Sequence, residues 1–196
     1  MRKIIAEIGV SQDGFIEGPN GELDWLIFKE DTAYAMKFLK RFDTIFYGRL
    51  AYEKFGLPCQ FEYECSDAER ELNGIINQMR KYVFTRTFTH VPGNGMVLRE
   101  HVRADVERIR DEIGKDIWLC GGANIIESLR QMDLIDEYVL SVQPVTLGAG
   151  KPLFQESPVQ MGLMLIKSES LKSGVVKLSY RPKTRIIPRR FYDRSF

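Results

Sequence analysis

The sequence predicts an α/β fold with a mostly parallel central sheet, helices on both faces of the sheet and an antiparallel hairpin at its C-terminal edge. Short apolar runs alternate with amphipathic helical patterns as far as residue 132, and the strand patterns after that point have no helices between them. The chain has 196 residues. A chain of this length suits one domain, because it buries about 70% of the surface that its unfolded form exposes.

The first half of the chain alternates predicted strands with predicted helices. Strands are expected at Lys3–Val10, Thr44–Tyr47 and Tyr82–Thr85, and helices at Glu30–Arg41 and Leu50–Phe55. A further helix begins at Ser66, which forms a capping box with Glu69 and is followed by the apolar face Leu72, Ile75, Ile76 and Met79. A long loop rich in turn residues follows the first strand, and loops in this position often carry function.

The second half ends in strands that follow one another directly. A short strand at Met96–Leu98, a helix from Val102 to Ile113, a strand at Asp116–Cys120 and a helix from Ala123 to Met132 are expected first. A strand at Glu137–Gln143 comes next, and Met161–Glu169 and Val175–Arg181 form a hairpin around Lys172-Ser173-Gly174. We therefore predict one domain over residues 1–182 and a basic tail over residues 183–196.

Composition and charge argue against several classes of protein. Hydrophobic residues make up 44% of the chain and charged residues 28%, with a net charge of +1, which is typical of a globular protein without a field that gathers nucleic acid. The C-terminal segment differs, because it contains Arg181, Lys183, Arg185, Arg189, Arg190 and Arg194 against Asp193 alone. Such a tail can contact RNA, a phosphate or an acidic partner, and the alternative is a solvated terminus or an arm that lies on the acidic body of the protein.

The cysteines and histidines predict neither a disulfide framework nor a metal site. The three cysteines are irregularly spaced, and only two histidines, His90 and His101, are present. Glu7 interrupts the first apolar run, which argues against a signal peptide, and no run approaches the ~18 apolar residues of a membrane helix. We expect a cytoplasmic protein with free thiols.

Three predicted strands end in residues suited to binding phosphate. They are followed by Gly48-Arg49, by Arg86-Thr87 after Thr85, and by Gly121-Gly122-Ala123-Asn124. Ligands of open α/β sheets bind beyond the carboxyl ends of the strands. The paired glycines and the helix N-terminus suit a pyrophosphate, and Arg49 and Arg86 suit a phosphate monoester such as the 2′-phosphate of NADP. A tight turn at the glycines and solvated arginines are the alternative interpretations.

Other catalytic chemistries lack their sequence signatures. There is no G-x-S-x-G elbow, no P-loop and no G-x-G-x-x-G fingerprint. Both histidines lie in polar segments, which argues against a nucleophilic triad. Hydride transfer is compatible with such a sequence, because the cofactor supplies the chemistry and the protein orients it.

Seven segments resemble one known family. The chain is similar to the dihydrofolate-reductase-like superfamily, and within it to the C-terminal reductase domain of bacterial riboflavin biosynthesis. The resemblance covers about residues 3–181, and it is carried by Lys3-Ile4-Ile5 with Ser11-Gln12-Asp13-Gly14-Phe15-Ile16, Gly21-Glu22-Leu23-Asp24-Trp25-Leu26, Tyr47-Gly48-Arg49-Leu50-Ala51-Tyr52-Glu53, Val83-Phe84-Thr85-Arg86-Thr87, Gly121-Gly122-Ala123-Asn124, Asp133-Leu134-Ile135-Asp136-Glu137, and Pro144-Val145-Thr146-Leu147-Gly148-Ala149-Gly150-Lys151-Pro152-Leu153-Phe154.

The resemblance implies a three-layer dihydrofolate-reductase-like domain that uses NADPH to reduce a pterin-like or pyrimidine-like heterocycle, often as a homodimer. It assigns the adenosine-side phosphate to Gly48, Arg49, Thr85 and Arg86, and the pyrophosphate to Gly121, Gly122, Ala123, Asn124 and Ile125. Asp13 and Phe15 would border the nicotinamide and the substrate. Trp25 would form an aromatic wall for a flat ring, with core packing as the alternative.

The resemblance also implies an acidic residue on the first helix, where Asp31 is the candidate and Glu30 is adjacent. A stabilising carboxylate at the helix N-terminus is the alternative role of Asp31. Two other functions remain open at this stage. A non-catalytic nucleotide-binding or dimeric scaffold protein would bind NADPH without oxidising it, and an RNA-associated protein would lose its salt-dependent RNA binding on deletion of residues 183–196.

The catalytic assignment predicts the behaviour of two neutralised variants. Asp31→Asn should lower single-turnover hydride transfer by about 10²–10⁴-fold, because general-acid assistance is worth about that much. The affinity for NADPH should not change. If Glu30→Gln has impaired turnover and Asp31→Asn has normal turnover, Glu30 is the acidic residue that serves the reaction. If both variants turn over normally, no acidic residue on this helix serves it.

Overall fold

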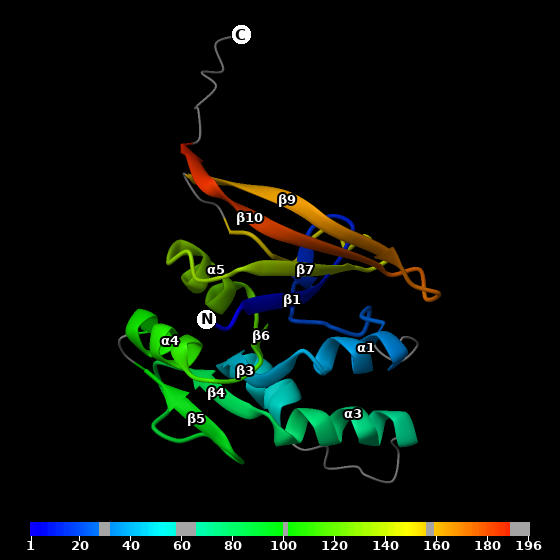
Figure 1. Ribbon diagram of the computed structural model, residues 1–196. Helices are drawn as coiled ribbons and strands as arrows, with labels where there is room; N and C mark the ends of the chain where they lie inside the picture. Colours follow the sequence, from blue (N-terminus) through cyan, green and yellow to red (C-terminus); the bar gives the residue numbers. More distant parts are fainter. Residues whose placement is uncertain (28–31, 58–65, 100–101, 156–158, 189–196) are drawn as a thin grey trace.

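An eight-stranded sheet forms the centre of the computed structural model, with the strand order β5-β4-β3-β6-β1-β7-β10-β9 (Figure 1). The structure describes residues 1–27, 32–57, 66–99, 102–155 and 159–188. The strands of this sheet are β1 (Ile4–Val10), β3 (Phe42–Gly48), β4 (Arg80–Phe84), β5 (Gly95–Leu98), β6 (Asp116–Cys120), β7 (Glu137–Val142), β9 (Val159–Ser170) and β10 (Val176–Pro188).

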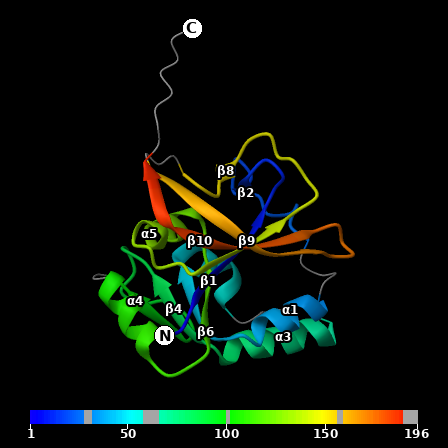
Figure 2. The same ribbon diagram turned by 45° about the horizontal axis from the view of Figure 1, so that its top comes forward.

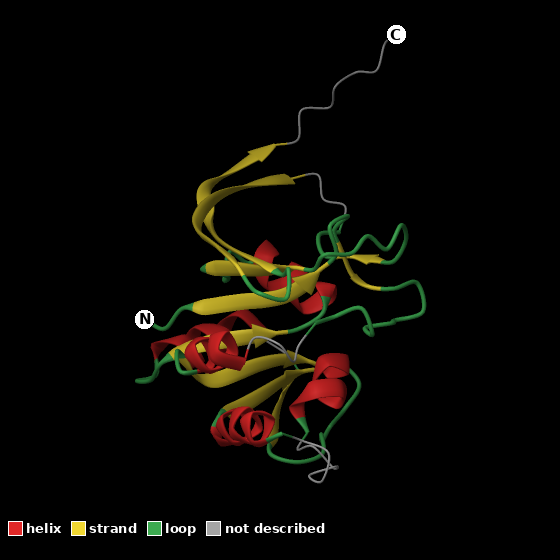
Figure 3. Ribbon diagram, turned by 90° about the vertical axis from the view of Figure 1, so that its right-hand side faces the viewer, coloured by secondary structure: helices red, strands yellow, loops and turns green. Residues whose placement is uncertain are grey.

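The sheet is parallel except at one edge. The strands from β5 to β7 all pair in parallel, whereas β10 pairs antiparallel with both β7 and β9. The predicted mostly parallel sheet with an antiparallel C-terminal hairpin is therefore confirmed. Figure 3 shows this hairpin curving away from the helical part of the molecule.

Helices cover both faces of the parallel strands. Figure 2 shows α1 and α3 on one side of the central strands and α4 and α5 on the other. These helices are α1 (Thr32–Leu39), α3 (Asp67–Gln78), α4 (Val102–Asp111) and α5 (Ala123–Gln131). The capping box at the start of α3 is confirmed, because Ser66 Oγ accepts from the Glu69 N–H at 3.3 Å and the Ser66 N–H donates to Glu69 Oε2 at 2.8 Å.

The central strand β1 separates two hydrophobic cores. Ile4, Ala6 and Ile8 pack with residues of α4 and α5, whereas Ile5 packs with residues of α1. Successive side chains of a strand point to opposite faces, so a strand covered on both sides is apolar at nearly every position. Glu7, on the face of Ile5, is the exception.

Two local features differ from the predicted elements. The predicted helix Leu50–Phe55 is a short helix, α2 (Arg49–Ala51), that continues as one wide π-helical turn, η1 (Tyr52–Gly56). In this turn the buried phenol of Tyr52 donates to the Pro92 carbonyl and accepts from the Gly95 N–H. These tertiary hydrogen bonds outweigh the local preference for a regular helix.

The hairpin and the first loop contain more strand than the sequence indicates. β10 continues to Pro188, so the boundary predicted between residues 182 and 183 falls inside a strand. A second, two-stranded sheet pairs β2 (Phe15–Glu17) with β8 (Lys151–Pro152). In the described ranges, no helix has the length and apolar character needed to span a membrane.

Asp13 joins the loop after β1 to the loop after β7. Its carboxylate accepts from Ser11 Oγ at 2.6 Å, from the Leu147 N–H at 3.1 Å and from the Gly148 N–H at 2.7 Å. These bonds, with the bond from Ser11 contributing most, lower the pKa of Asp13 to about 2. The carboxylate therefore connects two loops that lie far apart in the sequence.

The lowered pKa predicts a pH-dependent contribution of Asp13 to stability. A depressed carboxyl pKa stabilises the fold above the unfolded value of about 3.9, and this stabilisation is lost as the pH falls toward 2. At pH 5, Asp13→Asn should have a lower unfolding midpoint than the wild type. Thermal unfolding from pH 5 to pH 2 should show this difference shrinking, and a constant difference would contradict the assignment.

Candidate functional site

A cleft of about 1130 Å³ lies where β3, β4 and β6 end, and it extends between α1 and the faces of β1, β7 and β10. The register of the sheet explains its position, because Gly48 pairs with Phe84 and Tyr47 pairs with Cys120. The three strands thus end at nearly the same level. The predicted phosphate-binding residues that line this one cleft are Gly48, Arg49, Thr85, Arg86, Gly121, Gly122, Asn124 and Ile125.

The glycine pair after β6 brings backbone close to the cleft. A Cβ at Gly121 would lie 2.2 Å from Ile125 Cγ2, so a larger residue there would push against α5. At Gly122 the nearest atom would be Glu17 Oε1 at 3.9 Å, and the backbone has an ordinary extended conformation with φ −76°. Gly121 is therefore needed for packing, whereas Gly122 leaves open space in front of the backbone.

The N-terminus of α5 offers backbone donors to this space. Gly122 is the N-cap residue and has no side chain to accept from the first turn of the helix. Such free N–H groups, together with the positive end of the helix dipole, bind phosphate groups. The cradle thus fits a pyrophosphate. Ala123 is fully buried and does not line the cleft, so it can contribute only its backbone.

Basic side chains lie at the outer end of the cleft. Arg49 pairs with Glu53 at 3.0 Å and lies 5.5 Å from the centre of the Phe88 ring. Arg99, which the sequence analysis missed, also lines the cleft and donates from Nε to the Phe88 carbonyl at 2.7 Å. Arg86 is exposed and makes no hydrogen bond or ion pair with another described residue. This end suits an anionic group.

Thr85 shapes the loop that carries Arg86. Its side chain is buried, and its hydroxyl accepts from the N–H groups of Thr87 and Phe88, both at 3.3 Å. These bonds hold the chain in a tight turn after β4. Thr85 therefore positions neighbouring groups, in addition to lining the cleft itself.

The inner end of the cleft has aromatic walls and a polar network. Phe38 and Trp118 line it with their rings in an edge-to-face arrangement 6.1 Å apart. The same end of the cleft is lined by a hydrogen-bonded network of Glu7, Ser141 and Lys177. The sequence analysis missed this network, although a carboxylate within a buried strand is a signal that could have found Glu7.

The predicted residues of the first loop do not line the cleft. Asp13 and Phe15 are absent from its wall, where Ile16 and Glu17 of β2 lie instead. Trp25 also lies outside the wall, and its Nε1 donates to the Glu22 carbonyl at 3.0 Å. Of the two tryptophans, Trp118 lines the cleft and Trp25 does not. Asp31 and Glu30 lie outside the described residues.

The described residues contain no group of three or more histidine, cysteine, aspartate or glutamate side chains placed to hold a metal ion. The polar groups of the cleft are instead backbone N–H groups, guanidinium groups and two carboxylate–ammonium pairs, Glu7–Lys177 and Glu17–Lys151. This set suits an organic ligand that carries phosphate groups at one end and a flat ring at the other.

Comparison with known proteins identifies similar sequences and structures. The family model of the RibD C-terminal domain matches residues 2–177. The uncharacterized protein YyaP of Bacillus subtilis (strain 168) is 38% identical over 181 residues, which are 91% of this chain and 94% of that protein. A putative riboflavin biosynthesis protein from Shewanella sp. PV-4 has a similar structure, with a TM-score of 0.73 and 24% identity over 92% of this chain and 99% of that one.

Dihydrofolate reductase from Enterococcus faecalis, solved with NADP(H), has the same fold. Its TM-score is 0.58 at 16% identity, and the match covers 92% of this chain and 96% of that one. The dihydrofolate-reductase-like fold that the sequence predicts is therefore confirmed.

The geometry of the glycine pair predicts different outcomes for two valine variants. Gly122→Val should fold, because its φ is negative and the space is open, but it should lose measurable NADPH binding because the side chain fills the cradle. Gly121→Val should lose stability, by about 1–3 kcal/mol, because of overpacking against Ile125. Thermal unfolding and fluorescence titration with NADPH separate these effects. A folded Gly122→Val that binds NADPH like the wild type would place the pyrophosphate elsewhere.

Proposed function

The chain belongs to the RibD C-terminal domain family, and on this premise we propose that it is an NADPH-dependent reductase that transfers a hydride to a pterin-like or pyrimidine-like heterocycle. The family includes reductases with this fold. One observation carries the proposal: a single cleft joins the glycine cradle and basic end to a pocket with aromatic walls. A dinucleotide needs the first part, and a flat ring needs the second.

The residues of the cleft have distinct roles in this proposal. The N–H groups at the start of α5 bind the pyrophosphate, and Arg49, Arg86 and Arg99 bind the phosphate on the adenosine ribose. NADPH supplies the hydride when it is bound. Phe38 and Trp118 border the acceptor ring and limit the access of water.

We further propose that the protein is a homodimer. The edge strand β9 exposes three consecutive large apolar side chains, Met164, Leu165 and Ile166, each between 43% and 51% accessible. Exposed apolar edge strands are otherwise prone to aggregation, and natural proteins cover them. The mass of the protein in solution, measured by light scattering, tests this. The predicted cytoplasmic location stays a prediction, to be tested by cell fractionation.

Two measurements in sequence test the main proposal. NADPH and NADH are first titrated against the protein, and dihydrofolate, dihydropterins and aminopyrimidine ribose phosphates are then screened for loss of NADPH absorbance. Binding of NADPH without oxidation by any of these rings supports the alternative function, a non-catalytic nucleotide-binding or dimeric scaffold protein. Absence of NADPH binding contradicts both.

The basic end of the cleft predicts the cofactor preference. Arg86→Ala should weaken the affinity for NADPH by about 10–150-fold, because one charged hydrogen-bonding partner of the 2′-phosphate is lost. The affinity for NADH should stay nearly unchanged. Arg49→Ala should also weaken the affinity for NADPH, but by a smaller factor, because the ion pair with Glu53 already partly compensates the charge of Arg49. Fluorescence titration of both cofactors provides the measurement.

Arg108→Ala is a matched control for these variants. Like Arg49, Arg108 is a helical arginine that pairs with a glutamate four residues later, but it does not line the cleft. It should leave both affinities unchanged. If Arg86→Ala weakens the affinities for NADPH and NADH equally, the arginine does not bind the 2′-phosphate.

A further inference from the structure

Glu7 is an ionisable residue in the middle of the central strand β1, where its side chain faces the cleft rather than a fully packed core. On its face of β1 the preceding residue is the fully buried Ile5, and the next is Gly9. A Cβ at Gly9 would lie 2.4 Å from Leu26 Cδ2, so the missing side chain lets Leu26 approach β1. The side chain of Glu7 keeps 20% of its surface accessible and lines the cleft.

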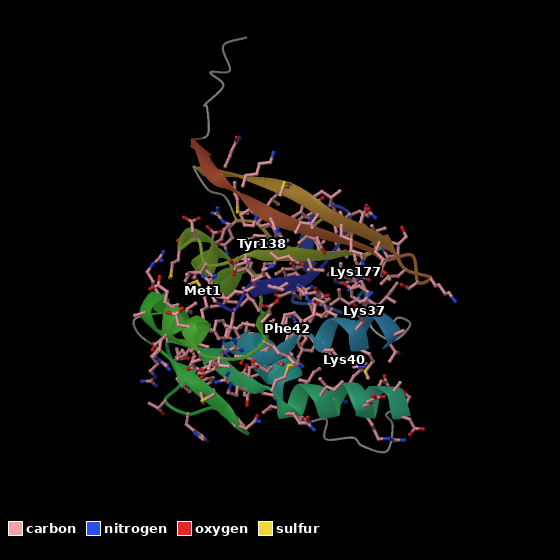
Figure 4. All side chains as sticks on the ribbon, viewed as in Figure 1. Met1, Lys37, Lys40, Phe42, Tyr138 and Lys177 are labelled. Carbon is pink, nitrogen blue, oxygen red and sulfur yellow. The ribbon has the colours of Figure 1, made fainter. Side chains whose placement is uncertain are left out.

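The next two strands of the sheet, β7 and β10, supply two donors to one oxygen of this carboxylate. Ser141 on β7 donates from Oγ to Glu7 Oε1 at 2.7 Å, and Lys177 on β10 donates from Nζ to the same oxygen at 3.0 Å. The sheet register produces this arrangement, because Ser141 pairs with Gly9 on one side and with Lys177 on the other. Figure 4 places Lys177 above helix α1, which carries Lys37.

The ammonium group of Lys177 makes two hydrogen bonds and a cation–π contact within the protein. One points to Glu7, a second reaches Ser141 Oγ, and the group lies 4.6 Å from the centre of the Tyr34 ring. Burial, followed by the negative charge of Glu7, raises the pKa of the Tyr34 phenol, so this ring stays neutral. Lys177 is therefore arranged to hold Glu7 rather than to bind a ligand.

The other oxygen of Glu7 is left for a ligand. Every hydrogen bond that Glu7 makes within the described part of the chain reaches Oε1, and Oε2 accepts none there. An ionised carboxylate accepts hydrogen bonds and donates none. A ring that presents N–H groups to Oε2 would be bound, whereas a ring that presents a carbonyl oxygen would be repelled.

We propose that Glu7 selects the acceptor ring through Oε2, and that it prefers rings that present an exocyclic amino group to this oxygen, as in 2-amino-4-oxopyrimidines and pterins. This inference rests on the proposed function for its assumption that the cleft binds a heterocycle. Ser141 and Lys177 are positioning residues, which fix the carboxylate and compensate its charge. Glu7 therefore decides which edge of the ring points toward the sheet.

The two donors make the effect of Glu7→Gln specific. The Lys177 ammonium can only donate, and Ser141 Oγ accepts from it and is left to donate, so the two groups hold the amide oxygen of the glutamine in the place of Oε1. The amide nitrogen then replaces Oε2 and points into the cleft. The substitution keeps the size of the side chain but turns the free acceptor into a donor, so the preferred ligand group should change from an amino group to a carbonyl.

Pterin and lumazine test this reversal, because they differ at position 2 of the pyrimidine ring, an amino group in pterin and a carbonyl in lumazine. Both are titrated by their fluorescence at a pH where the rings are neutral, with NADP⁺ present. The wild type should bind pterin about tenfold or more tightly than lumazine, and Glu7→Gln should prefer lumazine. Lys177→Met should reduce the wild-type preference without reversing it, and Lys177→Arg should restore part of it.

Glu137→Gln is the matched control. Glu137 is a buried carboxylate on the adjacent strand β7 and pairs with Arg41 at 3.2 Å, but it does not line the cleft. Its substitution should leave the ratio of the two affinities unchanged. A wild type that binds neither probe, or an unchanged ratio in a folded Glu7→Gln, overturns the inference.

The readout also separates this inference from the proposed function. The predicted reversal in a protein that never oxidises NADPH would support ring selection by Glu7 and contradict the reductase. Oxidation of NADPH by a wild type that does not discriminate the two rings would support the reductase and contradict the role of Glu7.

Discussion

The parallel hydrogen bonding of β3, β4 and β6 is the constraint on which the rest of the structure depends. Parallel strands in register end at the same edge of a sheet, and here Gly48 lies beside Phe84 while Tyr47 lies beside Cys120. Segments separated by tens of residues in the sequence thus reach one cleft. Each following segment begins with backbone or a cation free to meet a ligand, which is the usual arrangement in open α/β sheets.

The two ends of the cleft differ in how they handle charge. At the outer end, Arg49 pairs with Glu53, whereas Arg86 makes no ion pair with another described residue and the start of α5 adds the positive end of its dipole. At the inner end, Glu7 and Lys177 compensate each other within the protein. This difference in charge underlies the proposal that an elongated ligand binds with its anionic part outward and its neutral ring inward.

The ion pair at the inner end illustrates how a central strand tolerates a charge. A carboxylate in a buried strand carries a desolvation cost, which is offset only when partners with good geometry satisfy it. The antiparallel strand β10 provides such a partner, because it places Lys177 two strands away from Glu7 on the same face of the sheet. The C-terminal hairpin thus completes the cleft as well as the sheet.

The sequence by itself determined the fold class, most elements and the three strand-end segments that line the cleft. Strand and helix periodicities, the capping box at Ser66 and the paired glycines at 121 and 122 are local patterns, and local patterns can be read along the chain. Only the tertiary structure decided that Trp118 rather than Trp25 borders the cleft, that Asp13 joins two loops, and that Glu7 meets Lys177. These contacts depend on strand order and register, which bring together residues as far apart as 7 and 177, and no local pattern specifies that pairing.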